Sequence, residues 1–97
     1  MKYVEMKAKL QGGETIKVRG HGNSMTPLIR SGQLLTVEPI GADPIEVDDI
    51  VLAHVNGYYY FHKVTAIQGG RYRISNNHGH VNGWTKAVYG RVVKVED

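Results

Sequence analysis

Residues 49–64 read DIVLAHVNGYYYFHKV, and this stretch decides the fold. Asn56-Gly57 separates two runs rich in β-branched and aromatic residues, 50–55 and 58–67. A two-residue type I′ turn needs positive φ at both positions, and asparagine and glycine adopt such angles at little cost. The stretch therefore predicts a β-hairpin in the middle of the chain.

Turn signals and alternating apolar residues place further strands on both sides of this hairpin. Apolar and charged residues alternate over residues 4–10, and Gly12-Gly13 then turns the chain into a second alternating run. Gly69-Gly70 marks another hairpin, and Gly90 is expected to mark a bulge in the last strand. The expected strands cover residues 4–10, 15–19, 33–37, 50–55, 58–67, 71–75 and 87–95.

The same patterns argue against helices. No window shows a sustained helical period, and at most one helical turn is expected after Pro27. Residues 76–83 are expected to form a flexible polar loop. The sequence therefore predicts an all-β fold, a small, partly open β-barrel. Ninety-seven residues suffice for one domain and are too few for two, so we expect a single domain over 1–97, with N-terminal strands in 1–19.

Composition excludes several classes of protein. Hydrophobic residues make up 41% of the chain and charged residues 22%, which are ordinary globular values and disfavour disorder. Because the chain has no cysteine, it has no disulfide framework, no thiol nucleophile and no cysteine-based zinc site. The net charge of +3 is spread along the chain without a basic run, so it does not by itself indicate nucleic-acid binding.

Membrane and secretory signals are not found in the sequence. No stretch approaches the roughly 18 apolar residues that cross a bilayer. The first six residues, MKYVEM, do not form the apolar core of a secretory signal. We therefore expect a soluble cytoplasmic protein without a membrane anchor or a cofactor. A short free-standing core would suit a bacterial or phage-encoded protein.

Residues 22–27 read GNSMTP and supply the first candidate for chemistry. Ser24 lies among small, turn-forming residues before a Met-x-Pro, so it can be held exposed on a tight bend. His62 lies in a later apolar run, and strand pairing can bring it beside Ser24. A nucleophile and a base are the minimum for acyl transfer. Taken alone, however, a serine in such a stretch is most often a turn residue bonded to its own backbone.

The two stretches together resemble the LexA-like and type I signal peptidase superfamily. Its pattern reads G-x-S-M-x-P, then G-D-I/V-V, then K or H followed by R. Asp48 departs from this pattern, because the family prefers glycine there. The resemblance covers residues 20–95 and implies a soluble serine peptidase core of the LexA C-terminal or signal peptidase catalytic type. The matching residues are Gly22, Ser24, Met25, Pro27, Gly32, Asp49, Ile50, Val51, His62 and Lys63.

The resemblance implies that His62 is the catalytic base. LexA-type members carry lysine at this position, and His62-Lys63 is similar to the His-Arg of endoplasmic-reticulum and archaeal signal peptidases. Histidine suits proton transfer at neutral pH, because its reference pKa is near 6.5. Lys63 is the rival base. Neighbours on a strand face opposite ways, so only one of the two can point at Ser24.

Further roles follow from the same resemblance. The backbone N–H of Ser24, with that of Asn23, would face the developing oxyanion, and Gly22 would let the substrate backbone approach closely. Met25 and Lys63 would line the substrate cleft.

A residue that orients the base is harder to assign. The histidine-type signal peptidases place an aspartate in a Gly-Asp-Asn segment after the base, and Asn76 stands where that aspartate would be. An amide oxygen can orient an imidazole, but it stabilises imidazolium less than a carboxylate does. Asp48 or Asp49 could serve instead, although Asp49 could equally hold a turn.

Two other chemistries are considered and disfavoured. His78-Gly79-His80 could begin a metal site with His54 or His21, but a polar loop beside the cleft is the simpler interpretation, so we expect no metal. Tyrosines 58–60 and Trp84 could stack nucleic-acid bases. Basic residues do not cluster around these aromatic residues, so we do not expect a nucleic-acid partner.

Two functions remain from the sequence. The first is a serine endopeptidase with a Ser24/His62 dyad, which cuts a protein or peptide substrate lying extended against a strand edge. No Ala-Gly dipeptide occurs, which disfavours LexA-type self-cleavage. The second is a catalytically weak or inactive module of the same fold that binds extended peptides. The missing aspartate favours this second function, whereas the intact Ser24 and His62 favour the first.

Overall fold

The central hairpin forms where the sequence predicts it. The structure is a computed structural model that describes residues 1–97. In it, β3 spans Ile50–Val55, β4 spans Tyr58–Gln68, and the two pair antiparallel. Asn56 and Gly57 join them with φ of 49° and 87°. Both turn residues therefore have the positive φ that a type I′ turn requires.

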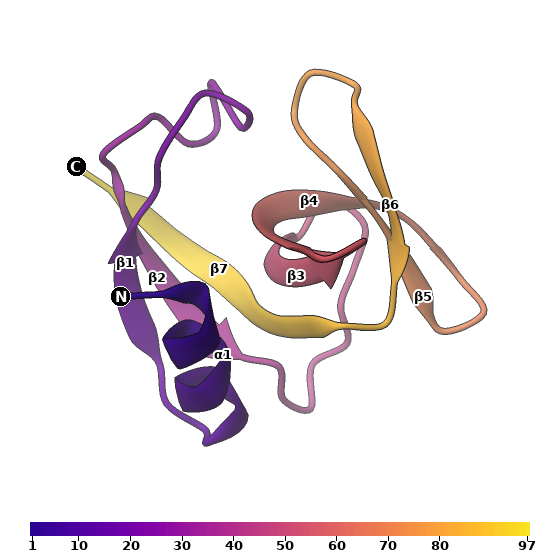
Figure 1. The fold of residues 1–97 in the computed structure, drawn as a ribbon, viewed down its shortest axis with the longest axis horizontal. Helices are drawn as coiled ribbons and strands as arrows, with labels where there is room; N and C mark the ends of the chain where they lie inside the picture. The colour runs from indigo at the N-terminus through magenta and orange to yellow at the C-terminus, as the bar shows by residue number, and fades with distance from the viewer.

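Seven strands form one antiparallel sheet in the order β1-β2-β7-β3-β4-β5-β6. The all-β class predicted from the sequence is confirmed, with one short helix added. Figure 1 shows α1, β1 and β2 on one side of the molecule and β5 and β6 on the other. The remaining elements are α1 (Tyr3–Gln11), β1 (Ile16–Arg19), β2 (Leu34–Pro39), β5 (Arg71–Ser75), β6 (Val81–Thr85) and β7 (Val88–Glu96).

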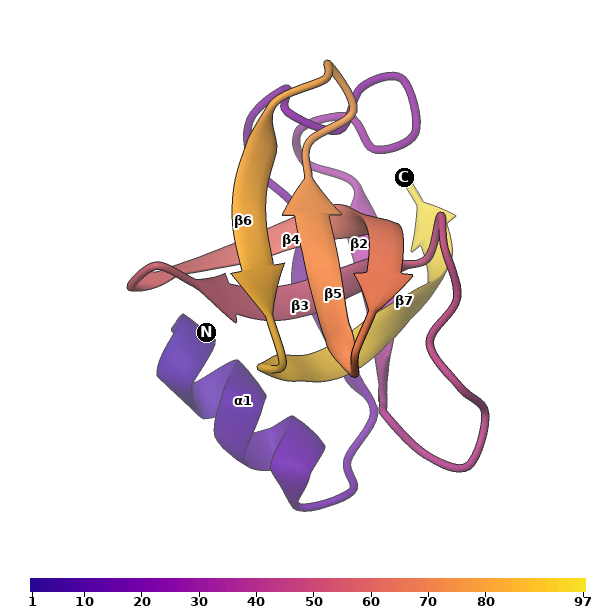
Figure 2. The same cartoon turned by 90° about the vertical axis from the view of Figure 1, so that its right-hand side faces the viewer.

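The sheet curls until its β6 end returns to β3. Thr85 Oγ1 on β6 donates to the carbonyl oxygen of His54 on β3 at 2.8 Å. Asn56, in the central turn, donates through Nδ2 to the carbonyl oxygen of Asn82 at 3.1 Å. Figure 2 shows β5 and β6 crossing in front of β3 and β4. Because β1 and β6 lie at opposite ends of the strand order, the curled sheet stays open there, as a partly open barrel should.

Residues 76–83 do not form the flexible loop that was expected. They make a short turn followed by the first residues of β6, which pairs antiparallel with β5. Asn76 closes this turn, because its Oδ1 accepts the backbone N–H groups of His78 (2.8 Å) and His80 (3.0 Å). The polar and glycine-rich composition concealed a strand whose backbone bonds are supplied by its neighbour.

The strand expected at residues 4–10 is also wrong, since these residues belong to α1. Met6 and Leu10 are buried and lie four residues apart, so their spacing fits both the alternation of a strand and one face of a helix. Most of the other residues in YVEMKAKLQ are strong helix formers. Propensity and packing of one face therefore decide for the helix. This helix is too short and too polar to span a bilayer.

Two clusters of buried side chains form the core, one on each face of β3. Leu52 belongs to the cluster beneath α1, whereas Val51, Ala53 and Val55 belong to the cluster beneath β5. This division follows from the alternation of side chains along a strand. The first cluster comprises Met6, Leu10, Ile16, Val18, Met25, Ile29, Leu35, Val37 and Leu52.

Gly90 lies where β7 packs tightly against α1 and β2. It pairs with Leu52, and the next pair joins Val88 to Ala53, so the bulge falls on the adjacent Tyr89. A Cβ atom at Gly90 would lie 2.8 Å from Val37 Cγ1 and 2.9 Å from Leu10 Cδ1. Glycine is therefore required there by the closeness of the packing.

Replacing Gly90 tests this close approach. Gly90→Ala should lower the free energy of unfolding by about 1–3 kcal/mol, because the added methyl overpacks the core beneath α1. Urea unfolding followed by circular dichroism measures the change. Gly41→Ala is the matched control, since a Cβ there meets nothing within 4 Å, and its effect should stay within about 0.5 kcal/mol. Equal stability of Gly90→Ala and the wild type would contradict the packing described above.

Candidate active site

Ser24 lies on the segment that joins β1 to β2. This segment bends sharply, and hydrogen bonds at its base hold it in place. Gly20 donates its N–H to the Gln33 carbonyl oxygen (2.9 Å) and accepts the N–H of Gly32 (2.8 Å), which closes the base of the segment. Met25, next to Ser24, is buried in the core cluster beneath α1. Since one neighbour is anchored in the core, Ser24 is held at the surface in a fixed position, half-buried.

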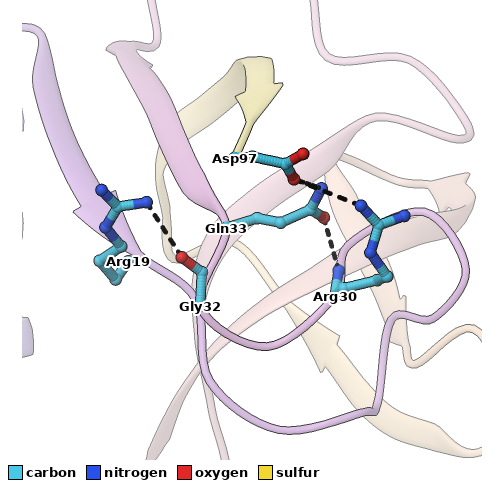
Figure 3. A network of polar contacts seen from close by, with 5 residues as sticks. All are labelled: Arg19, Arg30, Gly32, Gln33 and Asp97. Atoms are coloured by element: carbon cyan, nitrogen blue, oxygen red, sulfur yellow. Dashed lines mark hydrogen bonds and ion pairs between the residues drawn. The ribbon is translucent and has the colours of Figure 1, made fainter.

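A polar network fixes the end of the same segment (Figure 3). Asp97 Oδ1 accepts from Gln33 Nε2 at 3.0 Å and from Arg30 Nη2 at 3.3 Å, and Gln33 Oε1 accepts the Arg30 backbone N–H at 2.7 Å. The hydrogen bond from Gln33, and then the charge of Arg30, hold the pKa of Asp97 below its ordinary value. The network ties the return of the segment to the end of β7.

His62 projects from β4 toward Ser24. The side chain is 7% exposed, and its Nε2 lies 3.0 Å from Ser24 Oγ. The ring stacks on Tyr60, with centroids 4.7 Å apart. A proton on the serine hydroxyl can therefore pass directly to the ring, which is the contact that a nucleophile and its base need.

The other nitrogen of the His62 ring bonds Asn82 of β6. Nδ1 lies 2.7 Å from Asn82 Oδ1. Because an amide oxygen can only accept, Nδ1 carries the proton, and the neutral ring presents an unprotonated Nε2 to Ser24. Asn82 was not among the residues expected at the site, because the composition of residues 76–83 indicates a loop. Recognising the β5–β6 hairpin would have indicated that Asn82 lies on a strand.

The residues suggested by sequence for orienting the base bond elsewhere. Asn76 Oδ1 closes the turn before β6, as described above. Asp49 Oδ2 accepts the N–H of Glu46 at 2.9 Å and pairs with Arg91 at 3.2 Å. Asp48 is exposed and has φ of 78°, a region that favours glycine. Neither Asn76 nor Asp49 has a hydrogen bond to the imidazole.

Burial sets the protonation of His62. It lowers the pKa of His62 below the ordinary 6.5, the hydrogen bond with Asn82 raises this pKa in part, and the charge of His80 lowers it further. Burial destabilises the imidazolium by removing it from water, and the hydrogen bond to the neutral amide of Asn82 only partly offsets this loss. His62 is therefore neutral, and able to accept a proton, at pH 7.

Lys63 points to the opposite side of β4 from His62 and supports the Ser24 segment indirectly. Its Nζ donates to Asn77 Oδ1 at 2.9 Å. Asn77 in turn donates its backbone N–H to the Ser24 carbonyl oxygen at 2.8 Å and its Nδ2 to the Thr26 carbonyl oxygen at 2.9 Å. Lys63 thus contacts neither the Ser24 hydroxyl nor the cavity beside it.

His78 also contacts the segment on either side of Ser24. Its Nε2 lies 2.9 Å from the Asn23 carbonyl oxygen and 3.0 Å from Thr26 Oγ1. The structure contains no group of three or more His, Asp or Glu side chains placed to hold a metal ion. His78 therefore supports the backbone around Ser24.

Backbone donors are available beside Ser24. Gly22 gives its N–H to Ser31 Oγ at 3.2 Å. No protein acceptor takes the N–H of Asn23 or of Ser24. These two N–H groups therefore have no partner within the protein, which an oxyanion donor requires.

A cavity of about 770 Å³ opens beside Ser24 and His62, between α1, β1 and β4. Its walls are mainly apolar and aromatic, and Tyr3 stacks on Tyr59 across one side with centroids 5.5 Å apart. Met25 is among the residues that line it. The lining residues are Met1, Lys2, Tyr3, Met6, Lys17, Val18, Arg19, Gly20, His21, Gly22, Ser24, Met25, Ile29, Leu35, Tyr59, Tyr60, Phe61 and His62.

Comparison with known proteins gives one match. The sequence model of a family described as Peptidase S24-like matches residues 2–92, which is nearly the whole chain. No curated protein and no solved structure gave a match.

The contact between Asn82 and the ring can be tested by NMR titration of His62. Asn82→Asp should raise the pKa of His62, because a carboxylate stabilises imidazolium more than an amide does, and Asn82→Ala should lower it. Asn76→Asp is the matched control, since it adds the same charge to a turn that has no bond to the ring. Equal pKa values in Asn82→Asp and Asn76→Asp would contradict the role of Asn82.

Proposed function

Because this chain belongs to the S24-like peptidase family, we propose that it is a serine endopeptidase in which Ser24 is the nucleophile and His62 the general base. The observation that carries the proposal is the 3.0 Å separation of Ser24 Oγ from His62 Nε2. This distance lies within the reach that direct proton transfer needs.

The proposed reaction is acyl transfer in two stages. Ser24 Oγ attacks the scissile carbonyl carbon, and its proton passes to His62 Nε2. The N–H groups of Asn23 and Ser24 stabilise the oxyanion, and the imidazolium then gives its proton to the departing amine. A water molecule, deprotonated by His62, attacks the acyl-enzyme and releases the second product with Ser24 restored.

Asn82 orients the base in this mechanism. Its oxygen keeps the proton of the neutral ring on Nδ1, so that Nε2 remains free for the serine proton. The imidazolium that forms during the reaction gains less from an amide than from a carboxylate. We therefore expect slower turnover than in a peptidase with a Ser-His-Asp triad.

The substrate is proposed to be an extended peptide lying in the cavity against β1. β1 lies at one end of the sheet, so one side of its backbone has no strand partner. An added strand would satisfy these groups and place its scissile bond near Ser24.

A second candidate function is a peptide-binding module with little or no catalysis. The neutral Asn82 beside the base favours it, because the imidazolium would lack a carboxylate partner. Both candidates use the same cavity, and they differ in whether Ser24 is activated.

Chemical labelling separates the two candidates. A peptidyl electrophile directed at serine should acylate Ser24 in the wild type, and the adduct should be absent from Ser24→Ala, as intact mass spectrometry would show. Ser31, an exposed serine in the same segment, is an internal control and should stay unlabelled. Failure of a broad panel of such electrophiles to label the wild type would favour the binding module.

Mutation of the two basic neighbours identifies the base. His62→Ala should reduce kcat/KM for a cleaved peptide by about 10²–10⁴-fold. Lys63→Ala should cost about fivefold to tenfold, because it removes one hydrogen bond to Asn77 that supports the Ser24 segment.

The pH profile gives an independent measurement on the same enzyme. His62 is active when neutral, so activity should rise with pH through a limb below 6.5, where its lowered pKa lies. An alkaline limb, with a larger loss in Lys63→Ala than in His62→Ala, would assign the base to Lys63.

A further inference from the structure

The cavity beside Ser24 has one sign of charge. Among its lining residues are Lys2, Lys17 and Arg19, whereas none is aspartate or glutamate. The ion pairs of the protein lie elsewhere, and none of them includes these three cations. Positive charge without an acidic partner therefore lies beside the cavity, where a bound ligand can reach it.

The outer edge of β1 determines where a peptide backbone would bond. Gly20 exchanges backbone bonds with the β2 side, donating to Gln33 and accepting from Gly32. Bonding directions alternate along an antiparallel ladder, so Val18 also bonds toward β2. The backbone groups of Lys17 and Arg19 then point to the unpaired edge, where they can receive an added strand.

The side chains of β1 alternate between two environments. Ile16 and Val18 are buried, whereas Lys17 and Arg19 are exposed. Residues opposite each other on paired strands project to the same face. A peptide strand on the β1 edge would thus carry two residues facing Lys17 and Arg19, and the residue between them would face the same way as Val18.

We infer, on the basis of the proposed function, that the preferred substrate has three consecutive residues along β1 that are acidic, apolar and acidic. The two carboxylates face Lys17 and Arg19. Residues two apart on a strand are separated by about 6.6 Å on either partner, so the spacing of the charges matches. The apolar residue between them enters the cavity beside Val18.

The cavity suits a large apolar side chain at the middle position. It is lined by Val18, Met25 and Leu35, all buried, and by the aromatic residues Tyr59 and Phe61. Apolar and aromatic walls in a cavity of about 770 Å³ favour a bulky residue such as phenylalanine or leucine.

Arg19 is held in position for this contact. Its Nη1 donates to the Gly32 carbonyl oxygen at 3.0 Å, as Figure 3 shows, so one end of the guanidinium is fixed at the base of the Ser24 segment. Other N–H groups of the guanidinium remain without a protein acceptor and can bind a carboxylate. Lys17 has no side-chain hydrogen bond, and it can be replaced without removing one.

The test measures binding by the Ser24→Ala protein, which cannot cleave, using fluorescent peptides with the centres Asp-Phe-Asp, Asn-Phe-Asn and Lys-Phe-Lys. The Asp-Phe-Asp peptide should bind about tenfold more tightly than the Asn-Phe-Asn peptide at low salt, because two surface ion pairs each contribute a few-fold. Salt should reduce the difference.

Charge reversal identifies the residue responsible. Adding Lys17→Glu should weaken binding of the Asp-Phe-Asp peptide and strengthen binding of the Lys-Phe-Lys peptide. Lys86→Glu, which makes the same charge change at an exposed site outside the cavity, should leave the order of the three peptides unchanged.

Several outcomes would overturn the inference. Equal affinity for the three peptides, or no binding of any, would do so. Tighter binding of an oligothymidylate that is lost in the Lys17→Glu protein would assign the charged cavity to nucleic acid instead.

Cleavage by the wild type is scored separately from binding. Cleavage of all three peptides at equal rates would overturn the charge preference and leave the peptidase proposal standing. Binding of the acidic peptide without cleavage by the wild type would retain the preference and reject the peptidase.

Discussion

Both nitrogens of the His62 ring must be satisfied in a place that water hardly reaches, and the rest of the site depends on this constraint. An unpaired polar group in such a place would cost a large part of the stability of a small domain. Ser24 satisfies one nitrogen and Asn82 the other. These partners lie 38 and 20 residues from His62 in the chain, so only the folded sheet can supply them.

The curl of the sheet brings the two partners to opposite sides of the imidazole. Because β6 returns over β3 and β4, Asn82 reaches the ring from β6, while the segment between β1 and β2 presents Ser24 from the other direction. The turn between β5 and β6 also holds that segment by hydrogen bonds from Asn77 and His78. One hairpin thus holds both the amide bonded to His62 and the backbone around Ser24.

The electrostatics of the site favour a neutral His62 over a strongly stabilised imidazolium. Burial lowers the pKa of His62, and an amide beside the ring offsets this less than a carboxylate would. His62 can therefore accept a proton at neutral pH, whereas its imidazolium form gains little from its surroundings. Lys17 and Arg19 lie on β1 and have no hydrogen bond to His62, so the charge beside the cavity and the protonation of His62 are set by different residues.

Local patterns in the sequence determined the central hairpin, the glycine-pair turn after it and the all-β class, because each rests on the φ preferences of adjacent residues. The two blocks that resemble peptidases also singled out Ser24 and His62, whose Oγ and Nε2 atoms lie 3.0 Å apart in the structure. Tertiary structure decided the rest. The four-residue spacing of Met6 and Leu10 suits a strand as well as a helix. Residues 3–11 form a helix because the folded core buries one face of this segment, and the sequence alone does not show this packing. Asn82 became the partner of His62, and Lys63 a support for the Ser24 segment, because strand register and sheet curl are set by contacts between residues far apart in the chain.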